Sequence, residues 1–272
     1  MKKIDISYAS KSEHNLAQRL IIKTIENLSG KRKLEKLYTK YASKETNPLY
    51  FWSEVLNLMN IKINIKSKIP LNILPNGPLI VIANHPFGII DGLILCSLLS
   101  EKRKDFKIMT HETLKFLPEL EEFVLPVDFS ENKESKKLNI ETANKAKNHL
   151  LNQGSLIIFP SGSVSVAKTL KSEAKDEDWK TFPAKLIHQT RSNILPIYFD
   201  GKNGILFHLF ASKIKNQTLK YSTYIHETKK KIGKEIDIYP GKLIRYEDIS
   251  QIKDRKFLMK FLKETTYQLK EV

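Results

Sequence analysis

The sequence predicts an α/β protein with a largely parallel central sheet flanked by helices and a helical N-terminal region. Two observations support this fold class: short apolar runs alternate with helical patterns along most of the chain, and the first residues show only helical spacing. With 272 residues that are 41% hydrophobic, the chain is long enough to bury one large core. We expect a helical region over residues 1–60 and one larger domain over residues 61–272.

The N-terminal region contains three helical patterns. Apolar residues recur at helical spacing over residues 12–28, a second pattern covers residues 31–41, and a third begins at Pro48. The third has a broad apolar face around Trp52. Such a face packs more often on a protein core than on lipid, but aromatic residues beside many lysines are also typical of an interfacial helix. The second interpretation makes residues 1–60 a membrane-docking element.

From residue 61 onward, strands and helices alternate. Residues 61–66 alternate apolar and polar side chains, as in a half-buried strand, whereas residues 79–83 form a continuous apolar run typical of a strand covered on both faces. The other predicted strands are residues 106–109, 155–159, 193–199 and 235–239, and the predicted helices are residues 92–99, 139–152, 181–190 and 254–269.

Several classes of protein are excluded by composition. The best apolar stretch, residues 89–99, is shorter than the roughly 18 to 20 residues needed to cross a bilayer. The first residues lack the apolar region of a secretory signal, so we expect a cytoplasmic protein. A single cysteine, Cys96, excludes an internal disulfide, and the histidines lack partners at ligand spacing, so no metal site is predicted.

The net charge of +16 predicts attraction to a polyanion, which is an anionic membrane surface, an acidic carrier protein or nucleic acid. Lysine outnumbers arginine 40 to 6. Because nucleic-acid-binding proteins favour arginine, which makes bidentate hydrogen bonds to bases and phosphates, we expect no nucleic-acid partner and favour a membrane surface. The alternative that an AT-rich genome produced this composition without selection for binding stays open.

The most informative string is residues 83–92, Ala-Asn-His-Pro-Phe-Gly-Ile-Ile-Asp-Gly. Pro86 favours an extended His85 at the carboxyl end of a buried strand, where open α/β sheets bind ligands. Gly88 permits a sharp turn, and Asp91 falls at the start of the next helix. An ionised Asp bonded to one ring nitrogen leaves the other free to accept a proton. Taken singly, each residue is also explained as a core histidine and a helix cap.

A second string, residues 159–165, follows another buried strand and reads Phe-Pro-Ser-Gly-Ser-Val-Ser. Its Pro and Gly fit an ordinary turn. The backbone amides of such a turn, with nearby hydroxyls and a lysine, are also suited to a phosphate or carboxylate head group. The candidate substrate-binding residues of the two strings are Asn84, Phe87, Gly88, Pro160, Ser161, Gly162, Ser163, Ser165 and Lys168.

The first string resembles the first motif of the glycerolipid acyltransferase superfamily, the group of the bacterial 1-acylglycerol-3-phosphate acyltransferases. Five residues separate His85 from Asp91, as in the branch of the hemolysin-like and lyso-ornithine lipid acyltransferases, whereas four are usual elsewhere. Residues 159–165 resemble the third motif of that branch. Asp178-Trp179 resembles a later tryptophan element, and residues 194–197 resemble a Val-Pro-Val motif.

This resemblance covers about residues 78–245 and implies an acyltransferase domain over residues 61–272. It implies that His85 is the general base and Asp91 its orienter. The enzyme would move a fatty acyl group from acyl-CoA or acyl carrier protein to a lysophospholipid or lyso-amino-acid lipid, on the inner face of the membrane and without a bound cofactor. Ser161 replaces the usual Glu, and residues 124–128 lack the second motif's Arg, so the acceptor is not carried over.

The alternative function is a non-catalytic basic protein that retains this fold and binds membranes or nucleic acid. A lipid enzyme consumes an acyl thioester only in the presence of an acceptor. A nucleic-acid binder consumes none and instead shows a steep salt-dependent affinity for DNA or RNA. The intact His85 and Asp91 pair favours the enzyme, because a pure binding module requires neither.

Overall fold

The computed structural model describes residues 31–42, 47–66, 74–111, 120–130, 132–167, 169, 172–205, 207–208 and 217–271. The helix predicted over residues 12–28 and the candidate Lys168 lie outside these ranges. Among the described residues, no helix is both long and apolar enough to span a membrane.

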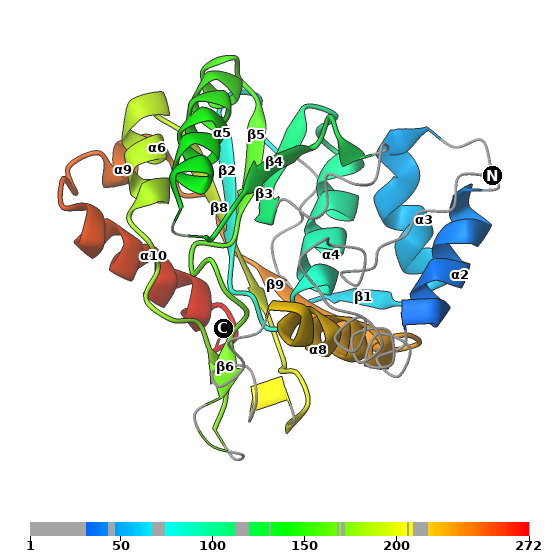
Figure 1. Cartoon of the computed structure of the whole chain (residues 1–272). Coiled ribbons are helices and arrows are strands. Elements are labelled where there is room, and N and C mark those ends of the chain that lie inside the picture. The colour runs from blue at the N-terminus through cyan, green and yellow to red at the C-terminus, as the bar shows by residue number, and fades with distance from the viewer. Residues whose placement is uncertain are drawn as a thin grey trace.

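A seven-stranded sheet forms the centre of the molecule (Figure 1). All neighbouring strands are parallel except β8 and β9, which pair antiparallel. In spatial order the strands are β1 (Lys62–Ile65), β9 (Glu235–Pro240), β8 (Asn193–Phe199), β2 (Leu79–Ala83), β5 (Ser155–Ile158), β3 (Phe106–His111) and β4 (Val124–Val127). The predicted fold class, α/β with a largely parallel sheet, is confirmed.

Helices cover both faces of the sheet (Figure 1). One face carries α2 (Lys31–Ala42), η2 (Pro48–Tyr50), α3 (Phe51–Leu58), α4 (Ile89–Ser100) and α8 (Gln217–Lys230). The other carries α5 (Lys133–Leu151), α6 (Phe182–Thr190), α9 (Tyr246–Ile249) and α10 (Arg255–Gln268). A short hairpin, β6 (Val166–Ala167) with β7 (Ala174–Lys175), stands apart from the main sheet.

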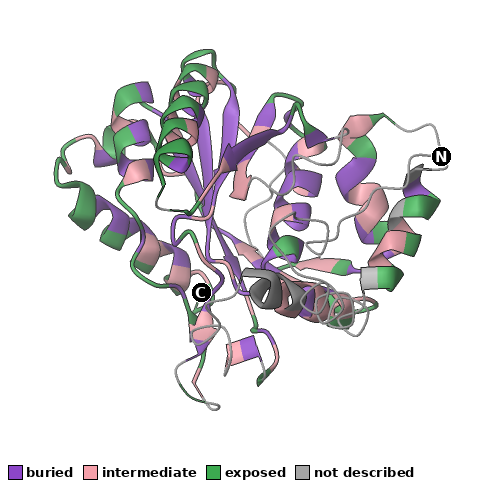
Figure 2. Cartoon of the chain, viewed as in Figure 1, coloured by how far each residue is buried: buried purple, intermediate pink, exposed green. Residues whose placement is uncertain are grey.

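The central strand β2 shows why the core has two halves. All five of its residues are buried, and successive side chains point to opposite faces of a strand. Val81 packs into the core under α3 and α4, whereas Ile80 and Ile82 pack into the core under α5, α6 and α10. Figure 2 shows this buried sheet between helices whose outer surfaces are exposed. The continuous apolar run is therefore a strand covered on both faces, as predicted.

Helix α3 decides between the two interpretations of the apolar face around Trp52. The side chain of Trp52 is 3% exposed and packs edge-on against Phe51, Phe106 and Phe123. The interpretation in which this face packs on the protein core is the one observed for Trp52, because its ring is buried among the aromatic side chains beside β3. Membrane docking by residues 1–60 stays a prediction. The domain boundary at residue 60 stays a prediction.

Candidate active site

The carboxyl end of β2 and the start of α4 form a tight turn around one carboxylate. Nδ1 of His85 lies 2.9 Å from Oδ2 of Asp91. The backbone N–H groups of Phe87 and Gly88 donate to the same oxygen at 2.9 and 3.0 Å. Asp91 therefore both caps the helix and holds one nitrogen of the His85 ring. The spacing of five residues puts the two side chains in direct contact.

The turn requires glycine at position 88 because the backbone there has a φ of +75°, a conformation that is strained for any residue with a Cβ. A Cβ at this position would also lie 3.3 Å from Cγ2 of Val164. The turn thus depends on glycine for both its backbone conformation and its packing.

The imidazole of His85 is held on its face as well as at Nδ1. Its ring stacks on Phe159, with 4.0 Å between ring centroids and 22° between ring planes. The side chain is 18% exposed, and Nε2 has no hydrogen-bond partner among the described residues. This arrangement presents one ring nitrogen to a ligand while the other is fixed.

Burial dominates the electrostatics of Asp91. Its side chain is fully buried, and Oδ1 has no hydrogen-bond partner among the described residues. Burial raises the pKa of Asp91 above the ordinary value, and the bonds to His85, Phe87 and Gly88 pull it back down. All three contacts to Oδ2 favour the carboxylate and offset part of the cost of burying its charge.

Asn84 and Phe87 have buried side chains that pack or form hydrogen bonds behind the turn. The amide of Asn84 donates to the carbonyl of Phe199 at 2.9 Å, and its oxygen accepts from the Phe199 N–H at 2.7 Å. This pair of bonds joins the end of β2 to the end of β8. Phe87 is buried, with Nζ of Lys231 4.0 Å from its ring centroid. Substrate contact by either side chain stays a prediction.

The second string lies against the first. The N–H of Ser165 donates to the carbonyl of His85 at 2.8 Å, so both predicted strings meet at one place. The N–H of Gly162 closes the predicted turn on the carbonyl of Phe159 at 3.0 Å. Gly162 is exposed, and Ser163 is half-buried.

The hydroxyls in this second string are used within the protein. Oγ of Ser161 donates to the carbonyl of Ser163 at 2.7 Å, and Oγ of Ser165 donates to Oδ1 of Asp176. Pro160 is buried and accepts the N–H of Lys180 at 2.9 Å. Neither Ser161 nor Ser165 thus has its hydroxyl proton free for a head group, and head-group binding by this turn stays a prediction.

Asp176 is a site residue that the sequence did not single out. It is almost fully buried, and its carboxylate accepts the N–H of His85 at 3.2 Å. Asp178, which precedes Trp179 in the tryptophan element, is instead fully exposed. The indole N–H of Trp179 donates to Asp176 at 2.8 Å.

The structure places His85 and Asp91 in contact at the carboxyl end of β2, a central strand of a largely parallel sheet. This arrangement agrees with the predicted resemblance to the glycerolipid acyltransferase superfamily. The family model described as Acyltransferase matches residues 54–272. The chain belongs to this acyltransferase family, and the predicted enzyme class is confirmed.

Two curated relatives carry the name lyso-glycine lipid O-acyltransferase. The protein from Phocaeicola vulgatus is 26% identical over 228 residues, which cover 80% of this chain and 77% of the relative. The protein from Bacteroides thetaiotaomicron is 24% identical over 234 residues, which cover 84% and 82%. Both alignments span most of each chain.

A solved structure shares the fold. It is the crystal structure of the 1-acyl-sn-glycerophosphate acyltransferase PlsC from Thermotoga maritima, with a TM-score of 0.53 and 13% identity. The match covers 93% of this chain and 95% of that chain. The likeness therefore extends over nearly the whole architecture.

Proposed function

We propose that this protein transfers a fatty acyl group from an acyl thioester, on CoA or acyl carrier protein, to the hydroxyl of a lyso-amino-acid lipid. The observation that carries the proposal is the His85 ring, which Asp91 fixes at Nδ1 and whose Nε2 has no hydrogen-bond partner within the described part of the chain. The printed names of the two relatives support a lyso-glycine lipid as the acceptor, with a lysophospholipid as the alternative.

In this mechanism, Nε2 of His85 takes the proton of the acceptor hydroxyl while that oxygen attacks the thioester carbonyl. A C–O bond forms, the C–S bond breaks, and the departing thiolate receives the proton from the imidazolium. The carboxylate of Asp91 stabilises the imidazolium and keeps Nε2 aimed at the acceptor. The hydroxyls of Ser161 and Ser165 donate within the protein, which supports direct transfer without an acyl-enzyme.

Not every backbone N–H group at the start of α4 is available to stabilise an oxyanion. The N–H groups of Gly88 and Asp91 are engaged inside the turn, with Asp91 Oδ2 and the Gly88 carbonyl. We assign stabilisation of the oxyanion to the remaining amides of the first turn of α4. We further propose that the enzyme works on the inner face of the membrane, supported by the net charge of +16.

The test uses purified protein with a labelled acyl thioester, offered as acyl-CoA and as acyl carrier protein in separate reactions. Each donor is combined with lyso-glycine lipid, with a lysophospholipid or with no acceptor, and products are identified by mass spectrometry. We expect the diacyl glycine lipid as the main product and thioester consumption only with an acceptor. Salt-sensitive binding to nucleic acid or lipid with no consumption would instead support the non-catalytic alternative.

His85→Ala tests the base in the same assay. We expect turnover to fall by about 10² to 10⁴, the usual contribution of a general base, with the fold intact because the residue ends a strand. Asp91→Asn, which keeps the shape but loses the charge, is expected to show a smaller loss. Near-normal turnover by folded His85→Ala would make the assignment of the base wrong.

A further inference from the structure

A second buried carboxylate, Asp176, lies behind the His85 turn. Oδ1 of Asp176 accepts the backbone N–H of His85 at 3.2 Å and also the hydroxyl of Ser165. Oδ2 accepts the indole N–H of Trp179 at 2.8 Å. The residue is 6% exposed, so these protein donors replace the water that a carboxylate normally binds.

Helix α10 holds the main chain of Asp176. The N–H of Asp176 donates to the hydroxyl of Tyr267 at 2.8 Å, and Nζ of Lys263 donates to the Asp176 carbonyl at 3.0 Å. Both partners lie on α10, which packs against α6 and β8. A continuous chain of hydrogen bonds therefore runs from α10 through Asp176 to the backbone of His85.

The main chain of His85 needs this support because it has left the sheet. The ladder of β2 ends at Ala83, and Pro86 has no N–H of its own. Both main-chain polar groups of His85 bond to one segment: its N–H to Asp176 and its carbonyl to the N–H of Ser165. Asp91 fixes the ring, but only a fixed backbone fixes the position from which the ring projects.

The carboxylate of Asp176 also interacts electrostatically with His85. Burial raises the pKa of Asp176 above the ordinary value, while the hydrogen bonds of Ser165 and Trp179 and the proximity of His85 lower it. All three contacts to its oxygens are donors, which favours the ionised form. The titratable groups facing Asp176 are His85, Tyr267 and Lys263. From other elements, Asp91 adds a carboxylate at the ring and Lys231 an ammonium over Phe87.

We propose that Asp176 is a positioning residue for the general base, acting through the His85 main chain and coupling it to α10. This inference rests on the proposed role of His85. Its carboxylate also gives the imidazolium formed during transfer a second negative neighbour besides Asp91.

Asp176→Asn tests the inference. An amide cannot accept on both sides, so an Asn oxygen that accepts from His85 and Ser165 turns its NH₂ group toward the Trp179 N–H. We expect kcat to fall about tenfold to a hundredfold through misplacement of the base, with KM for the acyl donor within about twofold. We also expect the acid limb of the kcat/KM profile to move to lower pH by about half a unit to one unit, because the imidazolium loses a negative neighbour.

The double variant Asp176→Asn with Trp179→Phe separates charge from packing. Phenylalanine removes the N–H that opposes the new NH₂ group while keeping an aromatic ring in place. Thermal stability should recover relative to Asp176→Asn alone, but the displaced pH profile should remain. Return of the pH profile to that of the wild type in the double variant would overturn the inference.

Thr142→Val is the matched control, because its buried hydroxyl donates to the carbonyl of Pro126 at 2.7 Å, between α5 and β4. It should lower stability and leave the pH profile in place. If Asp176→Asn also leaves the profile in place and loses activity only with its folded fraction, Asp176 is structural and the inference is wrong. An inactive His85→Ala in the same series would show that the proposed function survives that failure.

Tyr267→Phe carries the test if Asp176→Asn does not fold. This change removes the hydroxyl that accepts the Asp176 N–H and keeps the ring that packs on Tyr198. We expect a smaller fall in kcat with KM for the acyl donor unchanged. An unchanged kcat in folded Tyr267→Phe would overturn the link from α10 to the base.

Discussion

Gly88 and Gly233 form a natural pair for testing the His85 turn, because both have a φ of +75°. A Cβ at Gly88 would lie 3.3 Å from Val164, whereas a Cβ at Gly233, before β9, would meet no atom within 4 Å. We expect each Gly→Ala change to lower the free energy of unfolding by about 1–3 kcal/mol through backbone strain. Only Gly88→Ala should also lower turnover per folded molecule, because its neighbours orient His85.

Urea unfolding measures the change in the free energy of unfolding, and acyl-transfer kinetics of each variant measure turnover per folded molecule. Equal losses of turnover in Gly88→Ala and Gly233→Ala would contradict a special role for the Gly88 turn.

Asp91 gives a prediction about pH. Because burial raises its pKa above 3.8, ionisation of Asp91 costs folding free energy. Its contribution to stability is therefore fully present below about pH 4 and is lost as the pH rises through the raised pKa. Relative to Asp91→Asn, the wild type should lose unfolding free energy as the pH rises from about 4 toward 7.

The measurement is urea unfolding of both proteins at several pH values across that range. A difference between the two proteins that changes with pH in the opposite direction would show that the hydrogen bonds to Oδ2 outweigh burial.

Arg103 joins several elements at the amino ends of the central strands. Its guanidinium donates to the carbonyls of Pro75, Gly77 and Gln153 and to the carboxylate of Asp105. These bonds tie the loop before β2 and the end of α5 to the start of β3. Arg103→Ala leaves several carbonyls without a partner, so we expect a loss of about 2–4 kcal/mol of unfolding free energy.

The control for Arg103 is Arg245, whose pair with Asp248 is exposed. Arg245→Ala should cost no more than about 1 kcal/mol. Turnover per folded molecule should be normal in both variants, because His85 lies at the opposite ends of the strands. A loss of turnover in folded Arg103→Ala, measured beside urea unfolding, would contradict this separation.

Sequence periodicity predicted the elements that carry strong hydrophobic patterns and missed those that do not. The strand β4 is only four residues long, so its apolar pattern is short, whereas the seven-residue β8 was predicted although it contains Pro196. Pro126 in β4 lacks an N–H for a ladder, and it lies at the edge of the described sheet, where β4 pairs with β3. Helix α5 begins at Lys133, earlier than predicted, because Asn132 caps it by accepting the Ser135 N–H at 2.7 Å. Its first turns are polar, so no apolar period marks them.

The candidate site likewise contains residues that the sequence predicted and one that it missed. Local spacing and Pro86 were enough to predict that His85 and Asp91 meet. Asp176 was missed because it stands in a charged stretch, residues 173–178, that is typical of a solvated loop. Its burial is decided by long-range contacts with His85 and α10, which no local pattern contains.

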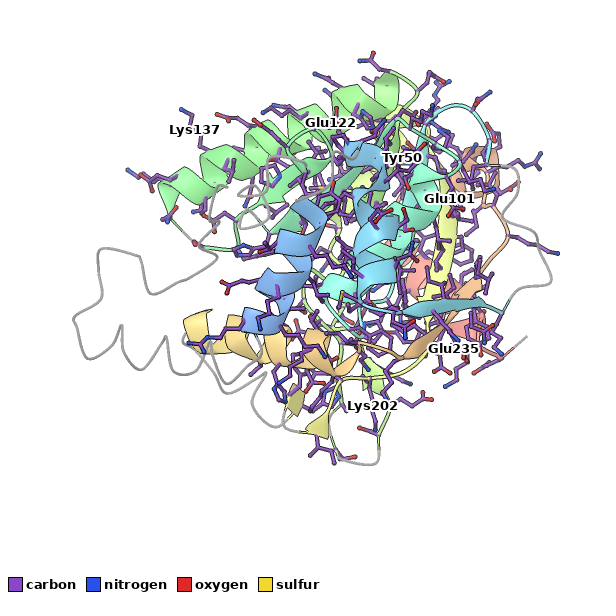
Figure 3. The ribbon with its side chains drawn as sticks, turned by 90° about the vertical axis from the view of Figure 1, so that its right-hand side faces the viewer. Tyr50, Glu101, Glu122, Lys137, Lys202 and Glu235 are labelled. Atoms are coloured by element: carbon purple, nitrogen blue, oxygen red, sulfur yellow. The ribbon has the colours of Figure 1, made fainter. Side chains whose placement is uncertain are left out.

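Exposed lysines lie on more than one side of the described structure. Figure 3 shows Lys137, on α5, and Lys202 on different sides of the structure, and both are exposed. Charge alone therefore attracts the protein to an anionic surface from several directions. Exposed aromatic side chains occur as well, with Phe257 61% exposed on α10 and Phe129 55% exposed after β4. Neither of the chain's two tryptophans belongs to this exposed group.

The last prediction concerns how the protein holds to a membrane. We expect co-sedimentation with anionic vesicles at low salt and little with neutral vesicles, because each lysine near an anionic surface contributes about 1 kcal/mol. High salt should release most of the protein, since surface charge is screened. Trp52 and Trp179 are both buried, so lipids carrying a quencher in the acyl chain should leave tryptophan fluorescence unchanged in the bound state. Quenching on binding would mean that the core around α3 opens at the membrane, and recovery in the supernatant under every condition would defeat docking while leaving the His85 chemistry untouched.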